Sequence, residues 1–106
     1  MIKRKKKSEE QRLKDIEEYE KQWDMFKEIW NERPHRSEIS GKSLGSIINS
    51  LFFDHLLEKS TYPQFKYEKD NICLINSEEH QLKNNGFPLP RHRELIEKAK
   101  KQFLNQ

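Results

Sequence analysis

The sequence predicts a small α+β protein in which two helices flank a short stretch of strands. Apolar residues recur at spacings of three and four near both ends of the chain, which is typical of amphipathic helices. Between these segments lie short apolar runs bounded by turn residues, which are typical of strands. The chain has 106 residues, of which 37% are charged and 32% hydrophobic, so we expect one domain with a small core.

The first segment, residues 1–7, is basic and is expected to be a flexible arm. Its five cations exceed the formal net charge of +3, so residues 8–106 have a net charge of 3 − 5 = −2. Net charge therefore does not indicate a general DNA-binding surface, and the arm either contacts phosphates or is an ordinary solvated terminus. Other basic residues that could line a groove are Lys59, Lys66, Lys69, Lys83, Arg91 and Arg93.

Residues 8–33 are expected to form a long amphipathic helix. Ser8 followed three residues later by Gln11 is typical of a capping box, and Pro34 ends the helix. One face carries an apolar stripe of Leu13, Ile16, Tyr19, Trp23, Phe26 and Trp30. So much apolar area is expected to pack on the rest of the chain, and a homodimer through this aromatic helix is the alternative.

The middle segment, residues 34–86, is expected to contain turns, short strands and one helix. A turn over residues 40–45 leads to an apolar run, residues 47–53, that predicts a strand or strand pair. After a turn at residues 59–63, the predicted returning strand comprises Phe65, Tyr67 and residues 72–75. Ser77 is the expected N-cap of a helix that ends at Asn84, Asn85 and Gly86.

The last segment, residues 87–106, is expected to be a proline-bounded linker followed by a helix from about Arg91 to Leu104. Its inward face would carry Leu95, Ile96, Ala99 and Phe103. The sequence has no apolar run of membrane length, so no membrane partner is expected. A single cysteine, Cys73, excludes an intramolecular disulfide, which favours a cytoplasmic location.

The polar residues of the middle segment predict phosphodiester chemistry. Asp54 and His55 are adjacent, Asn71 follows, and His80 comes last. A neutral imidazole can take a proton from water at physiological pH, so His55 is the natural general base. Asp54 offers an anionic oxygen and His80 a neutral nitrogen to a divalent metal, which stabilises phosphate and leaving group. Adjacent strand residues point to opposite faces, so we expect distorted backbone at Asp54 and His55.

This order and spacing, over residues 52–86, resembles the HNH endonucleases, which have the ββα-metal fold. The resemblance implies a small ββα-metal module flanked by the two helices, and an enzyme that hydrolyses DNA with one Mg²⁺ or Mn²⁺ ion. It implies Asp54 and His80 as metal ligands, His55 as general base, and Asn71 as the residue that pins the active-site loop. Asn84, one turn after His80, is a further candidate ligand, and Glu79 is an alternative carboxylate for the metal.

The chain departs from the HNH pattern where many members bind structural zinc through two Cys-x-x-Cys pairs. The corresponding positions are Ser37, Ser40, Asn76 and Glu79, so we expect a fold without structural zinc. His35 and His92 are expected to be structural or phosphate-contacting. Two function classes follow: a metal-dependent DNA endonuclease, or a catalytically inactive HNH-fold module that binds nucleic acid or assembles with a protein.

Overall fold

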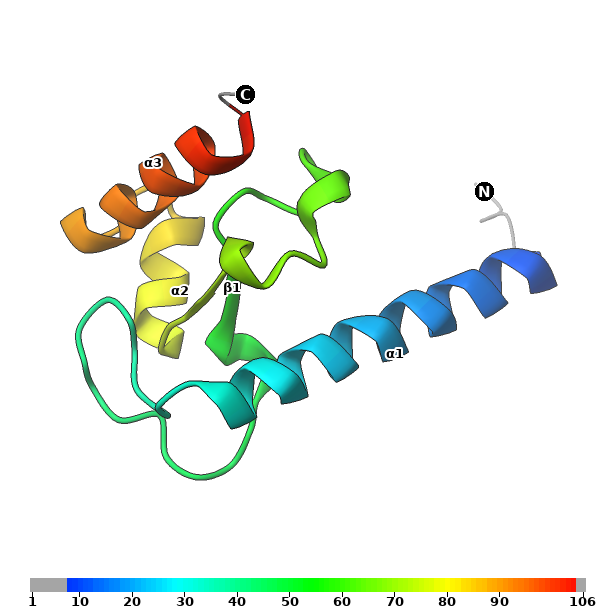
Figure 1. The fold of residues 1–106 in the computed structure, drawn as a ribbon, viewed down its shortest axis with the longest axis horizontal. Helices are drawn as coiled ribbons and strands as arrows, with labels where there is room; N and C mark the ends of the chain where they lie inside the picture. The colour runs from blue at the N-terminus through cyan, green and yellow to red at the C-terminus, as the bar shows by residue number, and fades with distance from the viewer. Residues whose placement is uncertain (1–7, 105–106) are drawn as a thin grey trace, which may run out of the picture.

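The computed structural model describes residues 8–104, and the predicted basic arm lies outside them. Three α-helices, one two-stranded sheet and three short 3-10 segments make up this part of the chain (Figure 1). In chain order these are α1 (Glu9–Glu32), η1 (Ser50–Phe52), β1 (Phe53–His55), η2 (Pro63–Phe65), η3 (Lys69–Asn71), β2 (Ile72–Leu74), α2 (Ser77–Asn84) and α3 (Pro90–Leu104). The predicted α+β class is confirmed, as is the long N-terminal helix.

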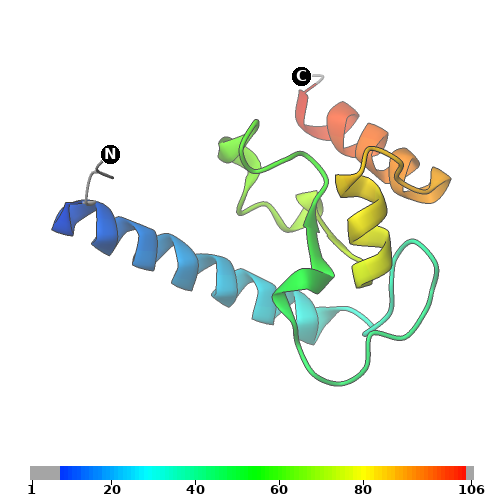
Figure 2. The same cartoon turned by 180° about the vertical axis from the view of Figure 1, so that it is seen from behind.

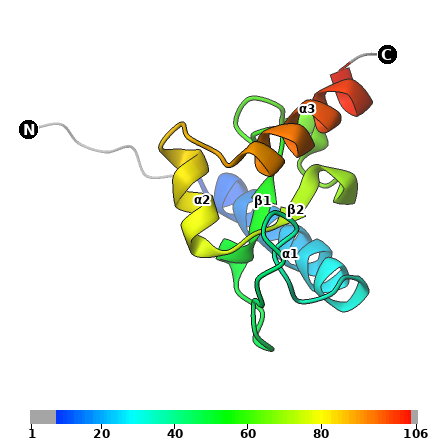
Figure 3. The same cartoon turned by 90° about the vertical axis from the view of Figure 1, so that its left-hand side faces the viewer.

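The sheet separates two small apolar clusters. β1 and β2 are antiparallel, with Phe53 opposite Leu74 and Asp54 opposite Cys73. Side chains alternate between the faces of a strand, so Phe53 and Leu74 face α1 while Cys73 faces α3. Figure 3 shows the two strands between α1 and the pair α2 and α3. Each face of the sheet therefore depends on a helix from a different end of the chain.

The second half of α1 supplies half of the buried residues in the larger cluster. Met25, Phe26, Ile29 and Trp30 are all buried. The ring of Phe26 stacks on that of Phe53 with 4.2 Å between centroids, and Trp30 stacks on His35 at 3.7 Å. The Nε2 atom of His35 also bonds the backbone oxygen of Trp30 at 2.9 Å, so His35 is a structural residue at the exit of the helix.

The predicted packing of α1 is wrong for its first half. Leu13, Ile16 and Tyr19 are 60%, 53% and 62% exposed, and this half projects from the rest of the chain (Figures 1 and 2). The reason is length: a 24-residue helix extends roughly 36 Å, whereas three-residue strands cover roughly 10 Å. The apolar stripe is longer than the sheet beneath it, and the predicted homodimer through this face stays a prediction.

The outer edge of β2 is closed by two side chains that follow α1. Arg33 donates from Nη1 to the backbone oxygen of Ile72 at 2.7 Å, and Glu38 accepts from the backbone N–H of Leu74 at 2.6 Å. Arg33 and Glu38 also form an ion pair at 3.0 Å. An unpaired strand edge invites pairing with another chain, and these two residues prevent it on this side of the sheet.

Several local predictions are wrong in detail. Phe65 lies in the 3-10 segment η2 and not in a strand, and the strand predicted within residues 47–53 contains Phe53 alone. The N-cap of α2 is Asn76, one residue before Ser77, because its side chain completes a capping box with Glu79. The predicted α3 is confirmed, with Ala99 buried and Leu95, Ile96 and Phe103 packed around it. No helix within residues 8–104 has the length and apolar character needed to cross a bilayer.

Candidate functional site

A cleft of about 720 Å³ lies along the free edge of β1. One wall is α2, and the other is the loop that follows β1. Four predicted site residues line it: Asp54, His55, His80 and Asn84. The other lining residues are Phe53, Glu58, Lys59, Ser60, Pro63, Lys66 and Lys83. The structure therefore brings together the residues that the sequence singled out, although they come from two elements separated by the second strand.

The expected backbone distortion at Asp54 and His55 is wrong. Both residues pair regularly with β2, Asp54 with Cys73 and His55 with Ile72, so their side chains leave opposite faces of the sheet. They reach one cleft because β1 is an edge strand of a two-stranded sheet. A cleft that runs along a free edge is open to both faces, so no irregular backbone is required.

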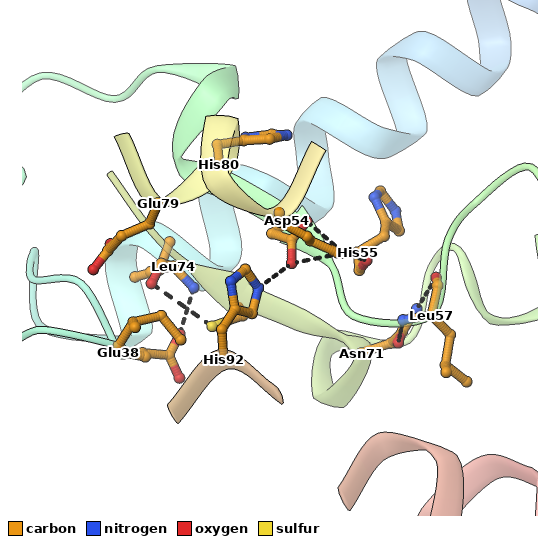
Figure 4. A network of polar contacts seen from close by, with 12 residues as sticks. Glu38, Asp54, His55, Leu57, Asn71, Leu74, Glu79, His80 and His92 are labelled. Carbon is orange, nitrogen blue, oxygen red and sulfur yellow. Dashed lines mark hydrogen bonds and ion pairs between the residues drawn. The ribbon is translucent and has the colours of Figure 1, made fainter. Parts of the chain in front are cut away.

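Asn71 holds the loop after β1, as predicted. This fully buried side chain accepts from the backbone N–H of Leu57 at 2.8 Å and donates to the backbone oxygens of Leu57 and Phe65 at 3.1 and 3.3 Å. An amide can accept and donate at once, so one side chain fixes both ends of the loop (Figure 4). Asn71 does not line the cleft and acts through the loop it holds.

His55 is held in one tautomer by the same loop. Its Nε2 atom lies 3.0 Å from the backbone oxygen of Lys66. Because a carbonyl oxygen can only accept, Nε2 must carry the proton, and Nδ1 keeps its lone pair. Burial lowers the pKa of His55, and the charges of Lys59 and Lys83 lower it further, against opposing contributions from the Lys66 carbonyl and Asp54. His55 is therefore a neutral base at neutral pH.

Asp54 is almost fully buried and is bonded on both oxygens. Lys83 donates to Oδ1 at 2.8 Å and to Oδ2 at 3.0 Å, and His92 donates from Nε2 to Oδ2 at 2.8 Å. Figure 4 shows His92 reaching Asp54. Burial alone would raise the pKa of this carboxyl, but hydrogen bonds and charges from His92 and Lys83 outweigh burial and lower it. Asp54 is thus a carboxylate held by two donors.

His80 is also fixed in one tautomer. Its Nδ1 atom lies 3.0 Å from the backbone oxygen of Leu51, so Nδ1 carries the proton and Nε2 has a free lone pair. Histidines that bind metals commonly donate their other nitrogen to a carbonyl in this way. The partly buried ring borders the cleft together with Asn84, one turn further along α2.

The side chains that line the cleft include the donor types that a hard divalent cation binds, and both oxygens of Asp54 are already bonded to Lys83 and His92. Asp54 provides carboxylate oxygen, Asn84 amide oxygen and His80 an imidazole nitrogen. Within residues 8–104 no group of three or more His, Cys, Asp or Glu residues could hold a metal. A site made by these residues would therefore have only two such ligands, completed by Asn84 and water. Cys73 is buried on β2, which raises the pKa of its thiol, and it lies outside the cleft.

Glu79 does not contribute to the cleft, and its prediction as an alternative metal ligand is wrong. Glu79 is buried, and its Oε1 accepts from the hydroxyl of Ser37 at 2.6 Å and from the backbone N–H of Asn76 at 2.9 Å. The Ser37 hydroxyl in turn accepts from the backbone N–H groups of Ile39 and Ser40. We call Ser37, Asn76 and Glu79 the Glu79 cluster, and Asp54, His55, His80 and Lys83 the Asp54 cluster.

The basic residues divide into two groups. Lys59, Lys66 and Lys83 line the cleft. The remaining three lie outside the cleft: Lys69 pairs with Glu28 and Glu32, Arg91 with Glu94, and Arg93 donates to the backbone oxygen of Pro88. The positive charge beside the site is therefore local and comes from the loop after β1 and from α2.

Sequence reasoning underestimated two residues. His92 is fully buried and bonds Asp54 from α3, which agrees with the structural alternative of its prediction, although the contact with Asp54 itself was not predicted. Lys83 was only one of six basic groove candidates, yet it touches both Asp54 and His55. For Lys83 a signal existed, because it lies three residues after His80 and so shares its helix face. For His92, 38 residues from Asp54, the sequence carries no comparable signal.

No family model, curated protein or solved structure matches this chain.

Proposed function

We propose that this protein is a metal-dependent endonuclease of the HNH type that hydrolyses phosphodiester bonds in DNA. The observation that carries the proposal is the shared cleft of Asp54, His55, His80 and Asn84. Asp54, His55 and His80 also carry the sequence resemblance, together with Asn71, which holds the loop beside the cleft. A base with a free nitrogen, an anionic oxygen and an imidazole nitrogen that line one cleft are the group types that phosphodiester hydrolysis requires.

His55 acts as the general base in this proposal. Its Nε2–H group donates a hydrogen bond to the carbonyl oxygen of Lys66, so only Nδ1 can accept a proton from water. The lowered pKa keeps Nδ1 unprotonated at neutral pH. The fixed ring orientation means that no rotamer search precedes proton transfer, which favours a well-positioned attack.

Asp54, His80 and Asn84 would hold one divalent cation, Mg²⁺ or Mn²⁺. His80 would bind through Nε2, since Nδ1 donates to Leu51. A cation bound there would supply charge compensation for the phosphate and stabilise the departing oxygen. Lys59 and Lys66 border the cleft beside Glu58, and Lys66 also pairs with Glu18 at 3.3 Å. Among the described residues, Lys59 is therefore the lining cation without a carboxylate partner that could attract a polyanionic substrate.

The test is a plasmid-nicking assay with and without Mg²⁺ or Mn²⁺, run beside a His55→Ala variant. The unmodified protein is expected to nick duplex DNA only with a divalent cation. His55→Ala is expected to lower the rate by about 10²–10⁴ because the general base is lost. A Ser60→Ala variant changes a neutral cleft residue and serves as the matched control. Undiminished cutting by His55→Ala would overturn the assignment of the base.

A second candidate function is a catalytically inactive HNH-fold module that binds nucleic acid or a protein partner. The observation that favours it is that Asp54 already accepts three hydrogen bonds, from Lys83 and His92. A carboxylate neutralised in this way is a structural group. Salt-dependent DNA binding with no cutting under any divalent cation would favour this second function.

A further inference from the structure

Lys83 follows His80 on α2, and its ammonium group bonds both Asp54 and His55. Its ammonium group donates to Oδ1 of Asp54 at 2.8 Å, to Oδ2 at 3.0 Å and to the backbone oxygen of His55 at 2.7 Å. The ammonium group therefore faces the Asp54 carboxylate and the His55 carbonyl at the same time. The side chains of Lys83 and Asp54 are only 12% and 5% exposed. The pair is thus held away from water, where attraction between opposite charges is strongest.

Lys83 occupies the positions on Asp54 that a metal would need. A carboxylate has about four lone-pair directions, and Asp54 uses three of them for Lys83 and His92. His92 is fully buried and does not line the cleft, whereas Lys83 does. Lys83 is therefore the partner that can leave, and its departure would free the oxygen Oδ1 completely.

We propose that Lys83 is the resident counter-cation of Asp54, and that a divalent cation binds in this cleft by displacing it. The proposal rests on the proposed function, because that function requires the metal. Displacement leaves the Lys83 ammonium in the cleft beside Asn84 and one turn from His80. There its charge can bind the phosphate of the substrate. Lys83 thus neutralises Asp54 when metal is absent and is a positioning residue when metal is bound.

The first test is a calorimetric titration of Mg²⁺ and Mn²⁺ into the unmodified protein, Lys83→Met and Lys59→Met. Lys83→Met is expected to bind about tenfold more tightly or better, because Asp54 no longer has to be released. Lys59→Met removes the same charge from the same cleft, but Lys59 is exposed and its ammonium contacts Gln22. Its metal affinity is expected to stay within about twofold because exposed charges are screened.

The outcomes separate this proposal from the proposed function. Equal metal affinity in the unmodified protein and Lys83→Met would overturn the proposal and leave the metal-dependent function intact. Metal binding by Lys83→Met alone would support the proposal and contradict the metal-dependent function of the native chain. Absence of binding in both would overturn the two together. An equal gain in affinity in Lys59→Met would also overturn the proposal, since it would reduce the effect to general charge.

The second test needs no substitution and so avoids any loss of folding. Hydrogen-bonded lysine ammonium protons exchange slowly enough for ¹⁵N-correlated NMR, and Lys83 is expected to give such a signal in metal-free protein. Saturating Mg²⁺ is expected to remove that signal while the Lys83 backbone amide stays visible. A Lys83 ammonium signal unchanged at metal saturation would show that the ion pair persists and would overturn the proposal.

Discussion

The two polar clusters meet on α2 at Glu79 and His80, and these two side chains are bonded differently. In the Glu79 cluster, Glu79 and Ser37 bond each other and nearby backbone groups in the interior. In the Asp54 cluster, His80 and His55 each use one nitrogen for a carbonyl and leave the other without a hydrogen-bond role. Glu79 and His80 are adjacent in sequence, so one residue step along α2 separates a side chain bonded in the interior from one that borders the cleft.

The Glu79 cluster bears on the expectation that this chain folds without structural zinc. Under the proposed resemblance its three residues stand at positions where zinc-binding cysteines would be expected, and they join two turns by hydrogen bonds. Each such bond is worth about 1 kcal/mol, against roughly 10–16 kcal/mol for structural zinc. The difference must come from apolar burial, and the aromatic half of α1 is where that burial is found.

The largest expected effect is the loss of both clusters when α1 is removed. Deleting residues 1–34 takes away Phe26 and Trp30, and truncating one buried aromatic typically costs about 3–5 kcal/mol. Because a small domain has only about 5–15 kcal/mol in total, the shortened chain should be unfolded or aggregated. Circular dichroism melting is the measurement. Deleting only residues 1–14, which removes the exposed Leu13, is the control and should leave a cooperative transition near that of the whole chain.

Asn71→Ala should have the next largest effect, because it fastens the loop that carries one side of the Asp54 cluster. Buried partners at Leu57 and Phe65 would lose their hydrogen bonds, at about 1–3 kcal/mol for each unsatisfied group. We expect the free energy of unfolding in urea to fall by roughly 2–4 kcal/mol. An Asn71→Ala protein as stable as its parent would show that the loop is held by other contacts.

The Ser37 and Glu79 pair should be coupled by a smaller amount. A double-mutant cycle with Ser37→Ala and Glu79→Ala is expected to give a coupling free energy of about 1–3 kcal/mol in urea unfolding, because the hydrogen bond is short and buried. The same cycle on the exposed pair Lys100 and Glu97 should give less than about 1 kcal/mol. Additive effects at Ser37 and Glu79 would contradict the structural role of the Glu79 cluster.

Activity should be nearly independent of pH above neutrality, whereas the free energy of unfolding should fall on acidification. The pKa values of His55 and Asp54 are lowered from 6.5 and 3.8 on folding. The unfolded chain therefore binds more protons below these values, so stability is full above them and falls on acidification. Cleavage should rise with pH and level off before pH 7, since His55 is neutral there. A rate that still climbs in proportion to hydroxide above pH 7.5 would contradict a base with a lowered pKa.

The sequence predicted the helices well and the strands poorly, for physical reasons. The apolar spacing from Trp23 to Trp30 and the stop at Pro34 are local features, so α1 could be placed from them. The extent of its packing could not, because exposure of Tyr19 depends on how far the short sheet reaches. The residues around Phe65 resemble a strand in sequence. In the structure Phe65 ends the 3-10 segment η2, within the loop that Asn71 holds.

The same distinction applies to the site. Asp54, His55, Asn71 and His80 follow from residue type and order along one segment. The role of His92 could not be predicted, because it arrives on Asp54 only when α3 folds back over the sheet. Nor does the sequence show which of two neighbouring polar residues on α2 faces inward. The capping box at Asn76 settles this, because it draws Glu79 back to the start of the helix and leaves His80 on the cleft.

The most direct test of the division between the two clusters is thermal unfolding with and without Mg²⁺ or Mn²⁺. A cation at 100 times its Kd stabilises the folded state by about 2.7 kcal/mol, which raises the melting temperature by several degrees. Glu79→Ala should melt lower than the unmodified protein but keep this increase. His80→Ala should melt near the unmodified protein and lose it. A full metal-induced increase in His80→Ala, or none in the unmodified protein, would contradict the assignment of the cleft as a metal-dependent site.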